Sequence, residues 1–235
     1  RGLPVKLAKI KDLRGKLNAQ LALSGRADQP EIDGQLSLVE GGWKHISFQS
    51  LTTNLSYRPT LFQINGGLQE AASQARFSWE GRVPVQLSMM PFQLVQQDEE
   101  LFFRLRGERA NLSMLAAFSE ELQKAEGPVD LWAELQGTMD QPRMSGEIRW
   151  GAGQLTLRQA GLPYKLLPGV IRLQDQKISL PQLTLESAGT ARLNADVELA
   201  GFIPEHIKAQ AQFDNFKALG RAGSEAYATG DITLN

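Results

Sequence analysis

The sequence predicts an all-β protein, an elongated and curved antiparallel sheet built from repeated hairpins, with one short helix. Three observations support this fold class. Apolar and polar residues alternate through many segments, glycine and proline recur between those segments, and one hairpin pattern occurs twice. Regular strand-length segments separated by turn residues are typical of all-β architectures.

The alternation is clearest in the segments 17–23, 101–105, 129–135 and 193–199. In each of them every second residue is apolar, and most of the residues between, counted over the four segments, are polar. Successive side chains of a strand point to opposite faces, so these segments have one apolar and one polar face. Strands of this kind form antiparallel sheets with one face in water.

The repeated pattern is glycine, an alternating strand, Gly-x-x-Asp-Gln-Pro, three residues, glycine and another strand. The first copy contains Gly15, Leu23, Gly25, Asp28, Gln29, Pro30 and Gly34, and the second contains Gly127, Leu135, Gly137, Asp140, Gln141, Pro142 and Gly146. Long-period repeats of one supersecondary unit build extended surfaces.

One segment has helical instead of alternating spacing. Leu112, Leu115, Ala116, Leu122 and Ala125 recur at that spacing, Asn111 is placed as an N-cap, and Gly127-Pro128 ends the segment. A weaker helical pattern of Phe213, Phe216 and Leu219 precedes the final strand. We therefore expect a first β-segment at 1–110, a helical connector at 111–126 that plugs an end of the sheet, and a second β-segment at 127–235 that continues the same sheet. Both chain ends read as cut, as in an excised piece of a longer protein.

Composition argues against several classes of function. The net charge of −1 disfavours nucleic acid as a partner, and the absence of cysteine excludes disulfides and thiolate sites. The two histidines, His45 and His206, lie on different segments without a nucleophile or metal-ligand pattern. We expect no catalytic residue, no metal and no cofactor, and hence a protein that is not an enzyme. No segment approaches the roughly 20 apolar residues of a membrane-spanning helix.

The candidate binding residues are the apolar members of the alternating segments. They are Leu17, Leu21, Leu23, Leu36, Leu38, Leu101, Phe103, Leu105, Val129, Leu131, Leu135, Ile148, Leu155, Leu157, Ile171, Leu173, Ile178, Leu180, Leu183, Leu185, Leu193, Val197 and Leu199. They either form a closed sandwich or barrel core, or line an open groove that binds apolar cargo.

The motifs also resemble a known family. Leu135 to Pro142, followed by Gly146-Glu147-Ile148, resembles a block of the TamB family, the inner-membrane subunits of the translocation and assembly module, within the AsmA-like superfamily of bridge-like transport proteins. Leu23 to Leu36, the segment from Asn111 to Val129, and Gly230 to Leu234 also resemble this family.

The resemblance implies a U-shaped, taco-like sheet with an apolar lining, in a periplasmic protein anchored in the inner membrane of a Gram-negative bacterium. It also implies pairing of the full-length protein, through its other parts, with an outer-membrane barrel protein of the TamA or BamA type. Its cargo would be unfolded outer-membrane β-barrel proteins, phospholipids or both. The expected function is a hydrophobic groove for this cargo in outer-membrane biogenesis and protein secretion. The alternative is a purely structural β-scaffold with a closed core that bridges the envelope.

Overall fold

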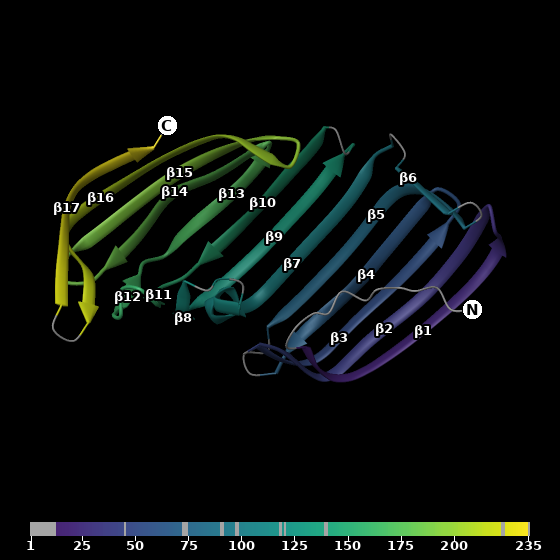
Figure 1. The fold of residues 1–235 in the computed structure, drawn as a ribbon, viewed down its shortest axis with the longest axis horizontal. Coiled ribbons are helices and arrows are strands. Elements are labelled where there is room, and N and C mark those ends of the chain that lie inside the picture. Colours follow the sequence, from purple (N-terminus) through teal and green to yellow (C-terminus); the bar gives the residue numbers. More distant parts are fainter. Residues whose placement is uncertain are drawn as a thin grey trace.

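The structure, a computed structural model, consists of one large antiparallel sheet of 17 strands (Figure 1). It describes residues 13–44, 46–71, 75–89, 92–96, 99–117, 119, 121–138, 141–221 and 224–234. The strands are β1 (Leu13–Arg26), β2 (Gln29–Trp43), β3 (Ile46–Arg58), β4 (Leu61–Glu70), β5 (Arg76–Met89), β6 (Phe92–Gln96), β7 (Leu101–Asn111), β8 (Leu122–Glu126), β9 (Pro128–Gly137), β10 (Pro142–Trp150), β11 (Gly153–Leu157), β12 (Pro163–Leu166), β13 (Gly169–Asp175), β14 (Lys177–Glu186), β15 (Thr190–Ala200), β16 (Ile203–Arg221) and β17 (Ser224–Leu234). The predicted all-β fold class is confirmed.

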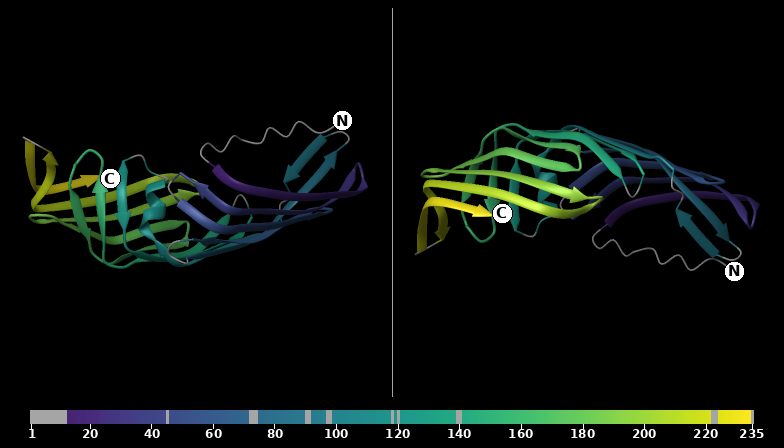
Figure 2. Two further views of the ribbon diagram at one scale, coloured as in Figure 1. Left: turned by 90° about the horizontal axis from the view of Figure 1, so that it is seen from below. Right: turned by 90° about the horizontal axis from the view of Figure 1, so that it is seen from above.

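The spatial order of the strands follows their pairing. It runs β1, β2, β3, β4, β5, β7, β9, β10, β13, β14, β15, β16, β17. Within the described ranges β1 pairs with β2 alone and β17 with β16 alone, so the sheet is open at both edges. The sheet is curved, and β6 and the short helix lie on the inner side of the curve (Figure 2).

Three adjacent strands are broken at neighbouring positions. β8 leads into β9 past Gly127, β10 leads into β11 past residues 151–152, and β12 leads into β13 past residues 167–168. β11 pairs with β8 on one side and with β12 on the other, and β12 also pairs with the end of β14. These three short strands therefore continue the sheet across the break. We call β8, β11 and β12 the flap.

The repeat in the sequence corresponds to two similar hairpins. We call β1 and β2 the edge hairpin. We call the broken strand β8–β9, together with the broken strand β10–β11 that pairs with it, the interior hairpin. Gly25 pairs with Pro30 in the first, and Gly137 pairs with Pro142 in the second. The side chains of both prolines are almost completely buried, at under 2% exposure. A glycine paired with a buried proline therefore flanks the turn of both hairpins, and Asp140 of the second turn lies outside the described residues.

The predicted helical connector at 111–126 is correct only in its first half. A 3-10 helix, η1, covers Leu112–Ala117, and the Ser113 N–H donates to Asn111 Oδ1 at 2.8 Å, as expected of a cap. The second half is strand β8, in which Leu122 pairs with Leu157 and Ala125 with Leu155. A β-bulge between them adds one residue, which gives a strand the three-residue apolar spacing of a helix.

The same physical reason explains the error at Phe213, Phe216 and Leu219. These residues belong to β16, whose pairing with β17 shifts between Phe213 and Phe216 and again between Lys217 and Leu219. Each bulge restores the apolar residues to one face after three positions instead of two. η1 lies about midway along the order of the strands, beside the ends of β7 and β9 (Figure 1).

Candidate functional site: one apolar face

The register of the sheet gathers apolar side chains on one face, which we call the apolar face. Directly paired residues of an antiparallel sheet share a face. One row of pairs crosses the molecule from β1 to β13 with Gly107 as its single gap: Leu17, Leu38, Leu51, Leu68, Phe77, Gly107, Leu131, Ile148 and Ile171. A second row continues to β16 through Leu173, Ile178, Val197 and Ile207.

All the predicted groove residues lie on this face. Most are placed there by strand pairing, and Leu155 and Leu157 by their packing against its apolar clusters. The residues thus share one face, and the structure adds how much of each side chain remains accessible.

Accessibility divides the predicted residues into three groups. Leu17, Leu21 and Leu23 on the edge strand β1 are 56%, 72% and 55% exposed. Leu38, Leu101, Val129 and Leu199 are buried. The remainder are half-buried: Leu36, Phe103, Leu105, Leu131, Leu135, Ile148, Leu155, Leu157, Ile171, Leu173, Ile178, Leu180, Leu183, Leu185, Leu193 and Val197. The face is thus neither a sealed core nor a bare surface.

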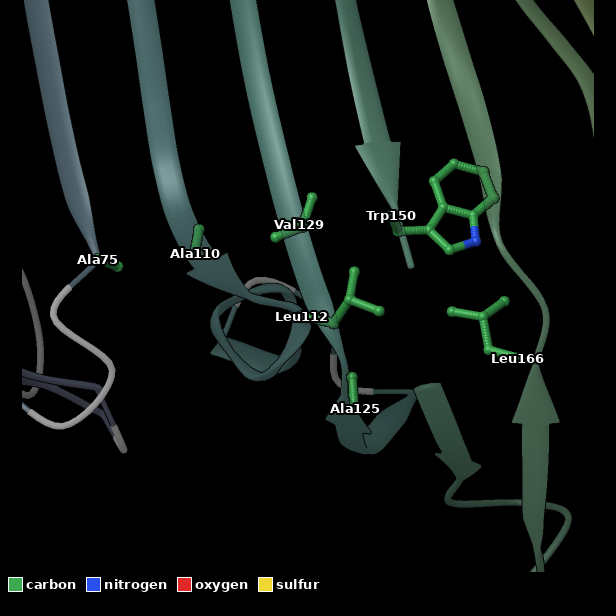
Figure 3. Packing of buried hydrophobic residues seen from close by; sticks show 7 residues of the cluster. All are labelled: Ala75, Ala110, Leu112, Ala125, Val129, Trp150 and Leu166. Atoms are coloured by element: carbon green, nitrogen blue, oxygen red, sulfur yellow. The ribbon is translucent and has the colours of Figure 1, made fainter. Parts of the chain in front are cut away.

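The centre of the face is covered by η1 and the flap. Leu112 of η1 packs in a cluster with Trp150 and Leu166, and these residues approach one another from different elements (Figure 3). Met114 contacts this cluster and also the cluster around Leu38. The Trp150 Nε1–H donates to the Leu167 carbonyl at 2.9 Å, which satisfies its polar atom. At the centre, the closed-core interpretation describes the packing.

The β5–β6 hairpin covers one end of the face. The Leu87 N–H donates to the Tyr57 hydroxyl at 2.7 Å, and the Met89 N–H donates to the Ala27 carbonyl at 2.7 Å. Tyr57, which is 2% exposed, stands on the apolar face, so these bonds hold the hairpin across it. Phe92 and Leu94 of β6 are 71% and 63% exposed. Alternation in the sequence does not predict this cover, because a strand that leaves the main sheet keeps the same alternation.

An apolar cavity of about 850 Å³ opens on the face between the flap and strands β14 to β16. Its lining includes Leu157, Leu183, Leu185, Leu193, Phe213 and Phe216. The first four were predicted. The two phenylalanines were missed, because the bulges of β16 gave their segment a helical pattern.

Tyr164 forms part of the wall of this cavity. It is 1% exposed, stacks on Phe216 with ring centroids 5.0 Å apart, and donates from its hydroxyl to the Ala218 carbonyl at 2.8 Å. Burial raises the pKa of Tyr164, so the phenol stays neutral. The cavity wall therefore carries no charge from this residue and suits an apolar occupant.

The opposite face of the sheet is polar. Arg104 lies between Glu80 at 2.7 Å and Glu134 at 2.9 Å, and its hydrogen bond holds the pKa of Glu134 below its usual value. The Asn54 amide donates to Asn65 Oδ1 at 3.1 Å. Such exposed pairs are ordinary features of a solvated sheet face.

No reactive constellation stands out in the described part of the chain. No group of three or more His, Asp or Glu residues there is arranged to hold a metal ion. His206 is exposed on β16, and His45 lies outside the described residues. Within those residues no helix has the length and apolar character needed to cross a membrane. Comparison with protein-family models, curated proteins and solved structures finds no match.

Proposed function

We propose that the chain is a non-enzymatic component of outer-membrane biogenesis whose apolar face shelters or conducts apolar cargo between two membranes. The observation that carries the proposal is the continuous apolar face, most of whose side chains are only half-buried. Monomeric proteins rarely leave contiguous apolar surface of more than a few hundred Å² in water, and larger patches mark partner or lipid sites.

The chemistry of this face suits acyl chains and the apolar sides of unfolded strands. Each CH₂ group removed from water contributes about 0.8 kcal/mol. The row of apolar residues has no fixed polar group, so cargo on its uncovered parts would be held by apolar contact alone. The cavity near Leu193 is the place with room for a bound chain on the present geometry.

The location in the cell and the partner protein are also part of this proposal. The resemblance to the TamB family supports a location in the periplasm, an anchor in the inner membrane and action with an outer-membrane barrel protein of the TamA or BamA type. On this proposal, that barrel is bound by other parts of a full-length protein, and the cargo is phospholipid, unfolded outer-membrane protein or both.

The test is photo-crosslinking in cells. A photoreactive residue replaces Leu131, Leu157 or Leu185 on the apolar face, and matched controls replace Asp130 or Glu198 on the polar face. We expect the apolar positions to capture lipid or outer-membrane protein and the controls to capture neither. Capture from the polar positions alone would contradict the proposal.

A structural scaffold is the second candidate, and the buried cluster around Leu112 and Trp150 favours it. The substitution Leu157→Arg separates the two. In a groove the long side chain extends to the cavity mouth, so the fold survives while cargo transfer fails. In a sealed core the unpaired charge costs several kcal/mol. Thermal unfolding and detergent sensitivity of cells distinguish these outcomes, with Gln154→Arg on the same strand as the control.

A further inference from the structure

The flap joins the main sheet along a line of neighbouring breaks. β9, β10 and β13 are adjacent in the main sheet, and each is separated from its flap strand by Gly127, by residues 151–152 or by residues 167–168. Gly127 has a φ of +139°, and the second break begins with another glycine, Gly151. Conformational hinges are commonly a few residues at the ends of strands, and these are often small. The aligned breaks therefore have the arrangement of a hinge about which the flap can turn as one unit.

The flap also covers the apolar cavity on strands β14 to β16. Leu157 of β11, Ala160 in the following turn and Tyr164 of β12 line the cavity from the flap side. Phe213 and Phe216 of β16 line it from the sheet side. A turn of the flap about the breaks therefore changes access to this cavity and leaves the paired strands of the main sheet in place.

The far side of the flap is held on β16 by contacts that cross the cavity wall. The Tyr164 hydroxyl donates to the Ala218 carbonyl at 2.8 Å, and its ring stacks on Phe216. The Gly220 N–H donates to the Ala160 carbonyl at 3.0 Å. Each of these contacts joins the flap to the sheet, so each is made when the flap lies on β16 and lost when it moves away.

The seam between the flap and β14 is short. Among the described residues, β12 meets β14 at Lys165 with Glu186 and at the next pair along. β14 and β15, in contrast, pair from one end of β14 to the other with one irregularity. Lys165 Nζ lies 2.7 Å from Glu186 Oε2, but such exposed ion pairs contribute little to stability. Away from the buried cluster at the breaks, individual contacts and not a long ladder therefore keep the flap closed.

We propose that the flap is a lid of this cavity, which turns about the three breaks and is latched on β16 by Tyr164. The present structure is the closed state, in which the Tyr164 ring completes the cavity wall. In the open state the flap parts from β14 and β16, and an apolar chain enters the cavity from the side. The role of the lid rests on the proposed function, whereas its movement needs no cargo.

Hydrogen exchange of the free protein, followed by NMR, measures this movement directly. The Gly220 amide donates to the flap, so its exchange reports opening. Tyr164→Phe keeps the stacked ring and removes the hydroxyl bond, and we expect it to speed exchange at Gly220 about fivefold. The matched control is Tyr57→Phe, which removes another buried hydroxyl from the same face, far from the flap, and should leave Gly220 unchanged. Equal exchange at Gly220 in the native chain and in Tyr164→Phe, or the same change in both variants, would overturn the latch.

A reversible lock tests the effect of the lid on binding. Lys165→Cys combined with Glu186→Cys places two cysteines at directly paired positions, where a disulfide fits, in a chain without other cysteines. Arg172→Cys with Ser179→Cys is the matched control, because it joins β13 to β14 within the main sheet. The probe is a fluorescent fatty acid, whose association is followed by stopped flow. Oxidation should slow association about tenfold in the lid pair, reversibly, and should have no effect in the control pair.

The two measurements separate failure of the lid from failure of cargo binding. Oxidation of the lid pair should also slow exchange at Gly220, whether or not the fatty acid is present. If the fatty acid binds and its association rate does not depend on oxidation, the lid is overturned. If the fatty acid binds to neither form, the cargo proposal fails, and exchange at Gly220 alone decides whether the flap moves: no slowing on oxidation would overturn that movement.

Discussion

The edge hairpin and the interior hairpin have the same sequence pattern and the same glycine–proline pair beside the turn, but they differ greatly in burial. Gly25 and Gly137 both adopt positive φ, +79° and +95°, at equivalent turn positions. Yet Leu17 on β1 is 56% exposed, and its counterpart Val129 on β9 is 5% exposed. The hairpin is therefore encoded locally, whereas burial depends on the neighbouring strands and on what covers the face.

The largest loss of stability is expected when the large buried side chain on the second strand of each hairpin is replaced by alanine. Trp150 and Leu38 occupy equivalent positions and are 5% and 4% exposed. Trp150→Ala should lower the free energy of unfolding by about 4 kcal/mol and Leu38→Ala by about 3 kcal/mol. Trp132→Ala, on the polar face, is the control and should cost under about 1 kcal/mol. Chemical denaturation measures all three, and equal losses at Trp150 and Trp132 would contradict the packing described here.

The glycines of the two second strands offer a sharper comparison. A Cβ on Gly153 would lie 2.1 Å from the Glu126 carbonyl oxygen, and one on Gly41 would lie 2.0 Å from the Phe48 ring. A ring can turn aside more easily than a backbone carbonyl can. We expect Gly153→Ala to cost about 3 kcal/mol and Gly41→Ala about 1.5 kcal/mol in unfolding free energy. The reverse order would show that backbone approach does not determine the break between β10 and β11.

Alanine substitutions on β1 and β9, the strands that carry Leu17 and Val129, should show how burial of the apolar face affects stability. Val129→Ala removes buried methyl groups and should cost about 2 kcal/mol. Leu17→Ala removes a larger side chain but should cost under about 0.5 kcal/mol, because that side chain is mostly exposed. Denaturant midpoints of the two variants test this expectation. Similar losses would mean that β1 is covered in solution by something that the present fold does not include.

How much the sequence could predict follows from the same comparison. Period-two alternation placed residues such as Leu131 and Ile178 on the correct face, because strand geometry depends on local sequence. The bulges near Leu122 and Phe216 led to a wrong prediction of helix, because one extra residue in a strand gives its apolar residues the three-residue spacing of a helix. The covers formed by η1 and the β5–β6 hairpin depend on contacts distant in sequence, such as Leu87 with Tyr57, which alternation does not reveal.

The smallest effect is expected from pH. Arg104 lowers the pKa of Glu134 on the interior hairpin, and Arg26 lowers the pKa of Asp28 at the turn of the edge hairpin. A lowered carboxyl pKa contributes stability above the unfolded-state value, which is lost as the pH falls through the folded value. The melting temperature should therefore decrease as the pH is lowered below about 4. Arg104→Gln should flatten this acid dependence more than Arg26→Gln, since Arg104 pairs with two carboxylates, and an unchanged slope in both variants would contradict this assignment.

The central claim is that the apolar face remains open enough to bind apolar cargo. The chain has no cysteine, so single-cysteine spin labels are possible without background. Leu193→Cys places a label at the cavity, and Asn194→Cys, on the next residue, places one on the polar face. On addition of a monomeric lysophospholipid, electron paramagnetic resonance should show reduced label mobility at position 193 and no change at position 194. No change at 193, or the same change at both positions, would contradict the claim.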